Sequence, residues 1–128
     1  MTSGLTSGRD IGGEFAAALR AADFAAIGRC LSPAVQLRAL LPGGMVDAAG
    51  RAAAVAMLAD WLNAAAGYTV LAASSDVVGR RLHLSYRVRL DGDDEPRVME
   101  QQAYCDVTAD AISSVRLLCS GDMPLRPG

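Results

Sequence analysis

His83 is the only histidine of the chain and the side chain best suited to move protons near neutral pH. If the segments 68–78 and 81–90 form a hairpin, Asp76 lies opposite His83 and can orient its ring. The next strand then places Tyr104 on the other side of the ring. His83 and Asp76 are therefore the catalytic candidates. The same pair also fits a histidine at the surface or at a dimer interface, and this interpretation is favoured because the polar face of the sheet should lie outside any cavity.

Tyr86 and Gln101 are predicted to be near neighbours on the opposite, apolar face of the same strands. They offer a hydroxyl, a carbonyl and an amide in a region otherwise rich in apolar side chains. Two interpretations stay open: the pair binds a ligand, or the two side chains satisfy each other or the backbone. Arg87 is predicted to lie opposite Glu100 on the polar face, where the simplest interpretation is a cross-strand ion pair.

The first half of the sequence must supply the elements that cover these strands. Apolar residues recur there with the helical period, Asp23 can cap a second helix, and Pro33 is expected to end it. The residues between Pro42 and Gly50 are expected to form a loop. The predicted elements are a helix at 14–22, a helix from 24 to about 32, a strand at 35–41 and a helix at 51–66 that Gly67 ends.

The second half changes to the alternating period of strands. Four strands are predicted, joined by turns at 79–80, 91–96 and 108–111, and they form an antiparallel meander. Helices followed by a meander indicate an α+β fold with the helices on one face of the sheet. The four strands are 68–78, 81–90, 97–107 and 112–119.

Two registers are open for the last hairpin, and they differ in whether Arg116 or its neighbours Val115 and Leu117 face the core. An extra turn residue, with Asp110 in a left-handed conformation, points Arg116 to solvent. We expect this register because burying an unpaired arginine costs several kcal/mol. On the core face we also expect Leu71 and Val77.

Composition limits the class of protein. The chain has 128 residues, 52% of them hydrophobic, and a net charge of −2, which indicate one folded domain at 13–128 after a mobile tail at 1–12. It has no basic block and 5% aromatic residues, so no nucleic-acid partner is expected. Three dispersed cysteines and one histidine predict neither disulfides nor a metal site, and no cofactor is expected. The absence of a signal peptide or a membrane-length apolar run predicts a cytoplasmic location.

Three local sequences resemble the nuclear transport factor 2-like superfamily, and within it the SnoaL-like proteins of high-GC bacteria. They are ADFAAIGRCLSPAV, the P-x(7)-G-R spacing from Pro42 to Gly50-Arg51, and the ending ISSVRLLCSGDMP. The resemblance covers about 14–124. It implies a cone: a curved, antiparallel or mixed sheet wrapped over three N-terminal helices, as in a cystatin-like roll, with a largely apolar cavity. It also implies a homodimer through the outer sheet face, here Arg87, Glu100, Tyr104 and Gln102.

The resemblance does not supply a mechanism. Ketosteroid isomerases of this superfamily carry a basic aspartate directly before the proline that aligns with Pro42, and Leu41 occupies that position. Their acid for the oxyanion hole has no counterpart on the predicted core face. The Asp-Arg-Asp set of the related epoxide hydrolases is missing as well, although Arg38 could supply an arginine. Isomerase activity is therefore not expected.

The implied cone cavity gives a predicted ligand pocket. For several of its members another interpretation stays open: Trp61, Cys105 and Cys119 also fit plain core packing, and Arg38 also fits a solvated surface. The predicted pocket residues are Tyr86, Gln101, Arg38, Trp61, Leu41, Cys105 and Cys119.

Two functions are compatible with these residues. The first is a SnoaL-like enzyme of the cyclase, isomerase or hydrolase type, acting on a small, largely apolar, polyketide-like molecule that Tyr86, Gln101 and Arg38 would position. The second is a non-catalytic dimeric module that binds a hydrophobic ligand or a partner. The missing acid favours the second.

Overall fold

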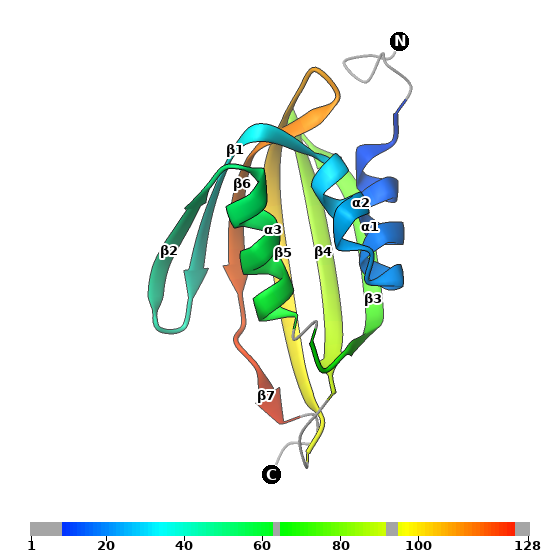
Figure 1. The fold of residues 1–128 in the computed structure, drawn as a ribbon, viewed down its shortest axis with the longest axis vertical. Helices are drawn as coiled ribbons and strands as arrows, with labels where there is room; N and C mark the ends of the chain where they lie inside the picture. Colours follow the sequence, from blue (N-terminus) through cyan, green and yellow to red (C-terminus); the bar gives the residue numbers. More distant parts are fainter. Residues whose placement is uncertain (1–8, 63–64, 92–94, 125–128) are drawn as a thin grey trace.

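The structure is a computed structural model that describes residues 9–62, 65–91 and 95–124. In this part of the chain three helices precede and interrupt a seven-stranded sheet (Figure 1). The elements are α1 (Ile11–Ala21), α2 (Phe24–Arg29), β1 (Leu31–Leu41), β2 (Gly44–Ala49), α3 (Arg51–Trp61), β3 (Tyr68–Val78), β4 (Arg81–Leu90), β5 (Arg97–Thr108), β6 (Ala111–Cys119) and β7 (Met123–Pro124).

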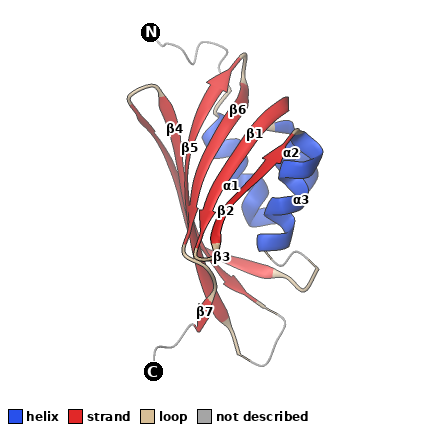
Figure 2. Cartoon of the chain, turned by 90° about the vertical axis from the view of Figure 1, so that its left-hand side faces the viewer, coloured by secondary structure: helices blue, strands red, loops and turns tan. Residues whose placement is uncertain are grey.

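The sheet is mixed and curved. Its strand order is β2-β1-β6-β5-β4-β3, with β7 paired to β5; β1 and β6 run parallel and the other pairs are antiparallel. Figure 2 shows the three helices on one side of the sheet and no helix on the other. We call these sides the inner face and the outer face. The expected α+β architecture of three helices under a curved sheet is confirmed.

The first two helices begin where their caps predict. The side chains of Asp10 and Asp23 each accept a backbone hydrogen bond of 3.0 Å from the third residue after them. Helix α1 starts at Ile11, inside the predicted tail, of which residues 1–8 lie outside the described part. Helix α2 stops at Arg29, earlier than predicted, because Leu31 already belongs to β1.

Pro33 therefore lies within β1 instead of ending a helix. The register between β1 and β6 shifts between Leu31 and Gln36, around this proline. The backbone N–H of Ile112 donates to the carbonyl of Cys30 at 2.8 Å, so pairing with β6 begins directly after α2. Pairing and burial at this point override the local helical pattern.

The segment 44–49, expected as a loop, is strand β2. It forms a hairpin with β1 in which Leu41 pairs with Gly44. Gly44 has a φ of 135°, a conformation that disfavours a side chain. The helix start at Arg51 is confirmed, but α3 ends at Trp61 and not at 66; the predicted residues 63–64 lie outside the described part.

From Ala72 onward, the first two hairpins of the meander follow the predicted registers. Asp76 lies opposite His83 in the β3–β4 pair, and His83 lies opposite Tyr104 in the β4–β5 pair. Arg87 pairs with Glu100 and lies on the outer face, as predicted. The inner face carries most of the predicted apolar residues, which pack on the helices.

Two predicted members of the inner face are exposed. Leu71 is 47% exposed because β3 bulges between Val70 and Ala72, and the bulge reverses the direction of its side chain. Val77 is 57% exposed near the end of β3. The expectation that these two residues belong to the core is wrong.

In the last hairpin, Val115 and Leu117 face the core and Arg116 faces solvent, as expected, but the extra residue lies in the strand and not in the turn. Its turn contains two residues, Ala109 and Asp110, with φ values of 52° and 69°. The extra residue is Ser113, in a bulge of β6, and it places Val115 on the inner face. The turn itself carries no additional residue.

Candidate functional site

The inner face carries a buried pair of polar side chains. The hydroxyl of Tyr86 donates to Oε1 of Gln101 at 2.5 Å. Both side chains are buried, and Gln101 is 0% exposed. Burial raises the pKa of Tyr86, with a smaller contribution from the neighbouring Cys105 and Cys119 thiols, so the hydroxyl stays protonated and acts as a donor.

The amide group of Gln101 has weaker partners. Its Nε2 donates to Sγ of Cys119 at 3.4 Å and to Sδ of Met99 at 3.9 Å. Sulfur is a poor acceptor, so this amide could form a stronger hydrogen bond to an oxygen. Gln101 is the only buried residue with a charged or amide side chain in the described ranges, so the pair has no carboxylate beside it.

The space between the inner face and the helices is nearly filled. A void of about 20 Å³ remains next to Tyr86, about the volume that admits one water molecule. Its lining is otherwise apolar: Phe15, Leu31, Ala54, Leu58, Leu84, Ala103, Ile112, Val115 and Leu117. Gln101 does not line it.

The other predicted pocket residues are spread over several positions. Cys105 and Cys119 are buried near the pair, and burial raises the pKa of Cys105 to about 12. Trp61 and Leu41 are half-buried against the core. Arg38 lies on the outer face, where its Nε donates to Asp47 at 2.9 Å. The structure thus brings Tyr86 and Gln101 together with Cys119, whereas Cys105 lies four residues farther along β5 and Arg38 lies on the outer face.

The outer face brings both catalytic candidates together. Nδ1 of His83 lies 3.0 Å from Oδ1 of Asp76. The opposite ring nitrogen, Nε2, lies 2.7 Å from Oε1 of Gln102. Tyr104 stacks on the ring with a centroid distance of 4.7 Å and an interplanar angle of 14°. Because both nitrogens are engaged, neither is free to take a proton from a substrate in this arrangement.

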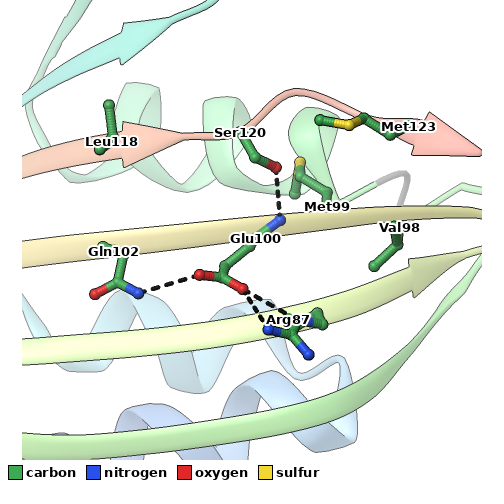
Figure 3. Close-up of a pocket in the computed structure, with 8 residues that line it drawn as sticks. All are labelled: Arg87, Val98, Met99, Glu100, Gln102, Leu118, Ser120 and Met123. Atoms are coloured by element: carbon green, nitrogen blue, oxygen red, sulfur yellow. Dashed lines mark hydrogen bonds and ion pairs between the residues drawn. The ribbon is translucent and has the colours of Figure 1, made fainter. Parts of the chain in front are cut away.

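The network continues along β5. Nε2 of Gln102 donates to Oε2 of Glu100 at 3.2 Å, and Arg87 donates to Oε1 of Glu100 through Nε at 3.0 Å and Nη2 at 2.8 Å (Figure 3). The hydrogen bonds from Arg87 and then Gln102 lower the pKa of Glu100, so this carboxylate stays ionised. All four predicted dimer-face residues take part in this network or stack on it.

A groove of about 340 Å³ lies beside this network. Figure 3 shows Met123 and Leu118 near its polar residues. Sequence reasoning missed Ser120, whose hydroxyl accepts from the backbone N–H of Glu100 at 2.9 Å, and missed β7 altogether. A two-residue strand leaves no periodic signal. The groove is lined by Arg87, Val98, Met99, Glu100, Gln102, Leu118, Ser120 and Met123.

Within the described ranges, no group of three or more metal-ligating side chains occurs. None of the helices found there has the length and apolar character to cross a membrane.

Comparison with protein-family models finds no match, and comparison with curated proteins finds none either. Solved structures do match. A candidate polyketide cyclase from Xanthomonas campestris pv. campestris is 20% identical with a TM-score of 0.66, over 84% of this chain and 86% of that one. A nuclear transport factor 2-like protein of unknown function from Cytophaga hutchinsonii is 17% identical with a TM-score of 0.63, over 94% and 95%.

A third similar structure is an epoxide hydrolase of the LEH-like type from M. tuberculosis. It is 14% identical with a TM-score of 0.66, over 86% of this chain and 80% of that one. The three structures carry different names, and one of them is a protein of unknown function. At these identities the likeness describes a shared fold, and function must be argued from the side chains.

Proposed function

Since the chain has the nuclear transport factor 2-like fold, we propose that it is a non-catalytic module that pairs with a second copy through its outer face. The observation that carries this proposal is the contrast between the two sides of the sheet. Between the sheet and the helices, the void beside Tyr86 measures about 20 Å³, and no carboxylate among the described residues is buried there. The outer side combines exposed apolar side chains with ion pairs, so it carries both positive and negative charges.

The apolar part of this surface is concentrated on neighbouring strands. Leu40 and Leu118 are cross-strand partners in the β1–β6 pair, and they are 46% and 54% exposed. Tyr104 is 42% exposed on the next strand. Exposed apolar side chains that lie together favour association, since burying them removes apolar area from water.

The charged part suits a second copy of the same chain. In a twofold dimer each patch meets itself, so the surface must be self-complementary. The outer face carries Arg87 beside Glu100 and Arg38 beside Asp47, at 2.8 Å and 2.9 Å. A surface that carries both positive and negative side chains can form such ion pairs with the second copy across a twofold axis.

The test is the oligomeric state of Leu118→Arg. Adding a cation at the centre of the apolar patch should shift the chain from dimer to monomer in sedimentation equilibrium. Val77→Arg is the matched control, because Val77 is equally exposed but lies on β3, at the sheet edge, outside the patch. A wild-type chain that stays monomeric at high micromolar concentration would contradict the proposal, and so would a Leu118→Arg dimer.

The buried polar pair favours a second candidate, the binding of a small apolar molecule with a carbonyl group. The Nε2 group of Gln101 has only sulfur acceptors in the described structure, so a ligand oxygen would give it a stronger hydrogen bond. Binding would require the helices to move away from the sheet. Cyclase, isomerase or hydrolase chemistry would need a further acid or base, and the described residues buried on the inner face include no carboxylate or histidine.

This candidate is tested by screening small apolar ketones for changes in the NMR signals of the Gln101 side-chain amide. Tyr86→Phe should weaken the binding of any ligand found, since it removes the hydroxyl that orients Gln101. A ligand whose affinity is unchanged by Tyr86→Phe binds elsewhere.

A further inference from the structure

The two ring nitrogens of His83 both face hydrogen-bond acceptors. Oδ1 of Asp76 accepts at Nδ1, and Oε1 of Gln102 accepts at Nε2. A neutral imidazole has only one N–H, so it can satisfy only one of these contacts. Both contacts are satisfied when the ring carries two protons and a positive charge.

The orientation of the Gln102 amide is fixed from its other end. Its Nε2 donates to Oε2 of Glu100 at 3.2 Å. Turning the amide over would point its oxygen at this carboxylate, which Arg87 holds ionised. The chain of contacts from Arg87 through Glu100 and Gln102 therefore presents an acceptor to His83.

Tyr104 adds a contact that favours the charged ring. Its ring stacks on His83 at 4.7 Å, within the range at which a cation is attracted to an aromatic face. The side chain of His83 is 19% exposed and that of Asp76 is 69% exposed, so solvent screens the charge of Asp76 more than it reaches the ring.

The remaining charges around His83 come from β4, β5 and β6. On β4 and β5, Arg81 pairs with Asp106 at 3.3 Å, and Arg87 pairs with Glu100. On β6, Arg116 lies opposite Tyr104. From β3, Asp76 contacts the ring directly. The two ion pairs occupy the other acids, so the anion that contacts His83 is Asp76.

We propose that His83 is a proton-operated switch of the outer face. In its doubly protonated form it links β3, β4 and β5 and holds Gln102 and Glu100, which line the groove, in the described arrangement. When the pH rises and the ring loses one proton, an unprotonated nitrogen faces an acceptor. The ring must then leave Asp76 or Gln102, and the polar wall of the groove loosens.

The consequence for association rests on the proposed function. If a second copy docks on the outer face in the described arrangement, association is stronger when His83 is charged. Losing one hydrogen bond of the network corresponds to about a two- to tenfold weaker association. Acidic conditions therefore favour the dimer and alkaline conditions the monomer.

The first experiment observes the ring itself. His83 is the only histidine, so ¹⁵N-labelled protein gives one imidazole signal set in long-range heteronuclear NMR. When the ring carries two protons, we expect both N–H signals to be those of hydrogen-bonded donors, and Asp76→Asn should change the signal of Nδ1. Asp47→Asn, which changes an outer-face acid paired with Arg38, is the control and should leave the ring unchanged. A doubly protonated ring whose Nδ1 signal does not respond to Asp76→Asn would overturn the switch.

The second experiment measures how association depends on pH, and it tests the dimer independently of the state of the His83 ring. Sedimentation equilibrium at pH 6 and pH 8 should show about two- to tenfold weaker association at the higher pH, and no pH effect in His83→Gln. A chain that is monomeric at both pH values contradicts the proposed function, while the NMR result still decides the switch. A dimer with equal affinity at both pH values overturns the coupling.

Discussion

On each face of β4 and β5, a polar side chain of β4 hydrogen-bonds to a partner on β5, but the two pairs differ in charge and in burial. Tyr86 and Arg87 are adjacent in sequence, and each finds its polar partner directly across on β5. On the inner face the pair is neutral and buried, and its donor and acceptor have few other hydrogen-bond partners within reach. On the outer face the pair is charged, reaches water, and continues into a chain that ends at Asp76. The same strands therefore carry one fixed polar contact and one that can respond to solution conditions.

The strongest test of this contrast uses neighbouring leucines of β6. Leu117 is 5% exposed and lines the inner void, whereas Leu118 is 54% exposed on the outer face. Leu117→Ala should lower the free energy of unfolding by about 2–5 kcal/mol, since it enlarges the void. Leu118→Ala should change it by about 0.5 kcal/mol or less. Urea denaturation at low protein concentration measures both, and equal losses would contradict the assignment of faces.

The next effect concerns the buried polar pair. Tyr86→Phe leaves Oε1 of Gln101 buried without its donor, which should cost about 1–3 kcal/mol of unfolding free energy. The double variant Tyr86→Phe with Gln101→Leu removes both partners and should be less destabilised than the sum of the single changes. Additive losses in urea denaturation would show that the two side chains do not depend on each other.

Alkaline pH provides a smaller test of the inner face. Burial raises the pKa of Cys105 from 9.0 to about 12, and it also raises the pKa of Tyr86. Above about pH 9 the unfolded chain loses a proton that the folded chain keeps, so stability is complete below this pH and falls as pH rises. The slope should approach about 1.4 kcal/mol per pH unit for each group. Cys105→Ala should lower the slope between pH 9 and 10 without abolishing it, because burial also raises the pKa of Cys30. A wild-type curve flat to pH 11 would contradict the burial.

The smallest expected effect belongs to the outer face. Arg87→Gln removes the ion pair with Glu100, whose side chains are 56% and 37% exposed. The loss of unfolding free energy should be about 0.2–1 kcal/mol and should shrink at high salt, because solvent screens exposed pairs. Arg38→Gln, at the more exposed pair with Asp47, is the comparison and should cost no more. At a protein concentration at which the chain is monomeric, a loss as large as that of Leu117→Ala would contradict the exposure of this pair.

The sequence predicted the pairing of the first two hairpins of the meander from Ala72 to Cys105, because this pairing depends on residues close in the chain. Alternating side chains and short turns set this register, and Asp76, His83 and Tyr104 therefore met as expected. The solvent-facing position of Arg116 followed from the cost of burying an unpaired charge. These predictions use only residues that are close in the sequence and the fact that burying an unpaired charge costs free energy.

The missed features depend on distant contacts. Pro33 lies in a strand because β6, far along the chain, pairs with β1 there, and no local pattern announces this pairing. The alanine-rich segment 44–49 has little preference for a strand, and it becomes one by pairing with β1. The bulge at Leu71 and the near absence of a cavity beside Tyr86 depend on side-chain volumes packed from several elements, which periodicity does not contain.

The place of β6 in the sheet also constrains how the chain is made. It is one of the last strands in sequence, yet it lies between β1 and β5 and joins the two halves of the sheet. During synthesis, the β1–β2 hairpin and the β3–β5 meander must therefore wait as separate pieces with unpaired edges until residues 111–119 emerge. This long-range closure predicts slow folding and a late step in which most of the cooperativity arises.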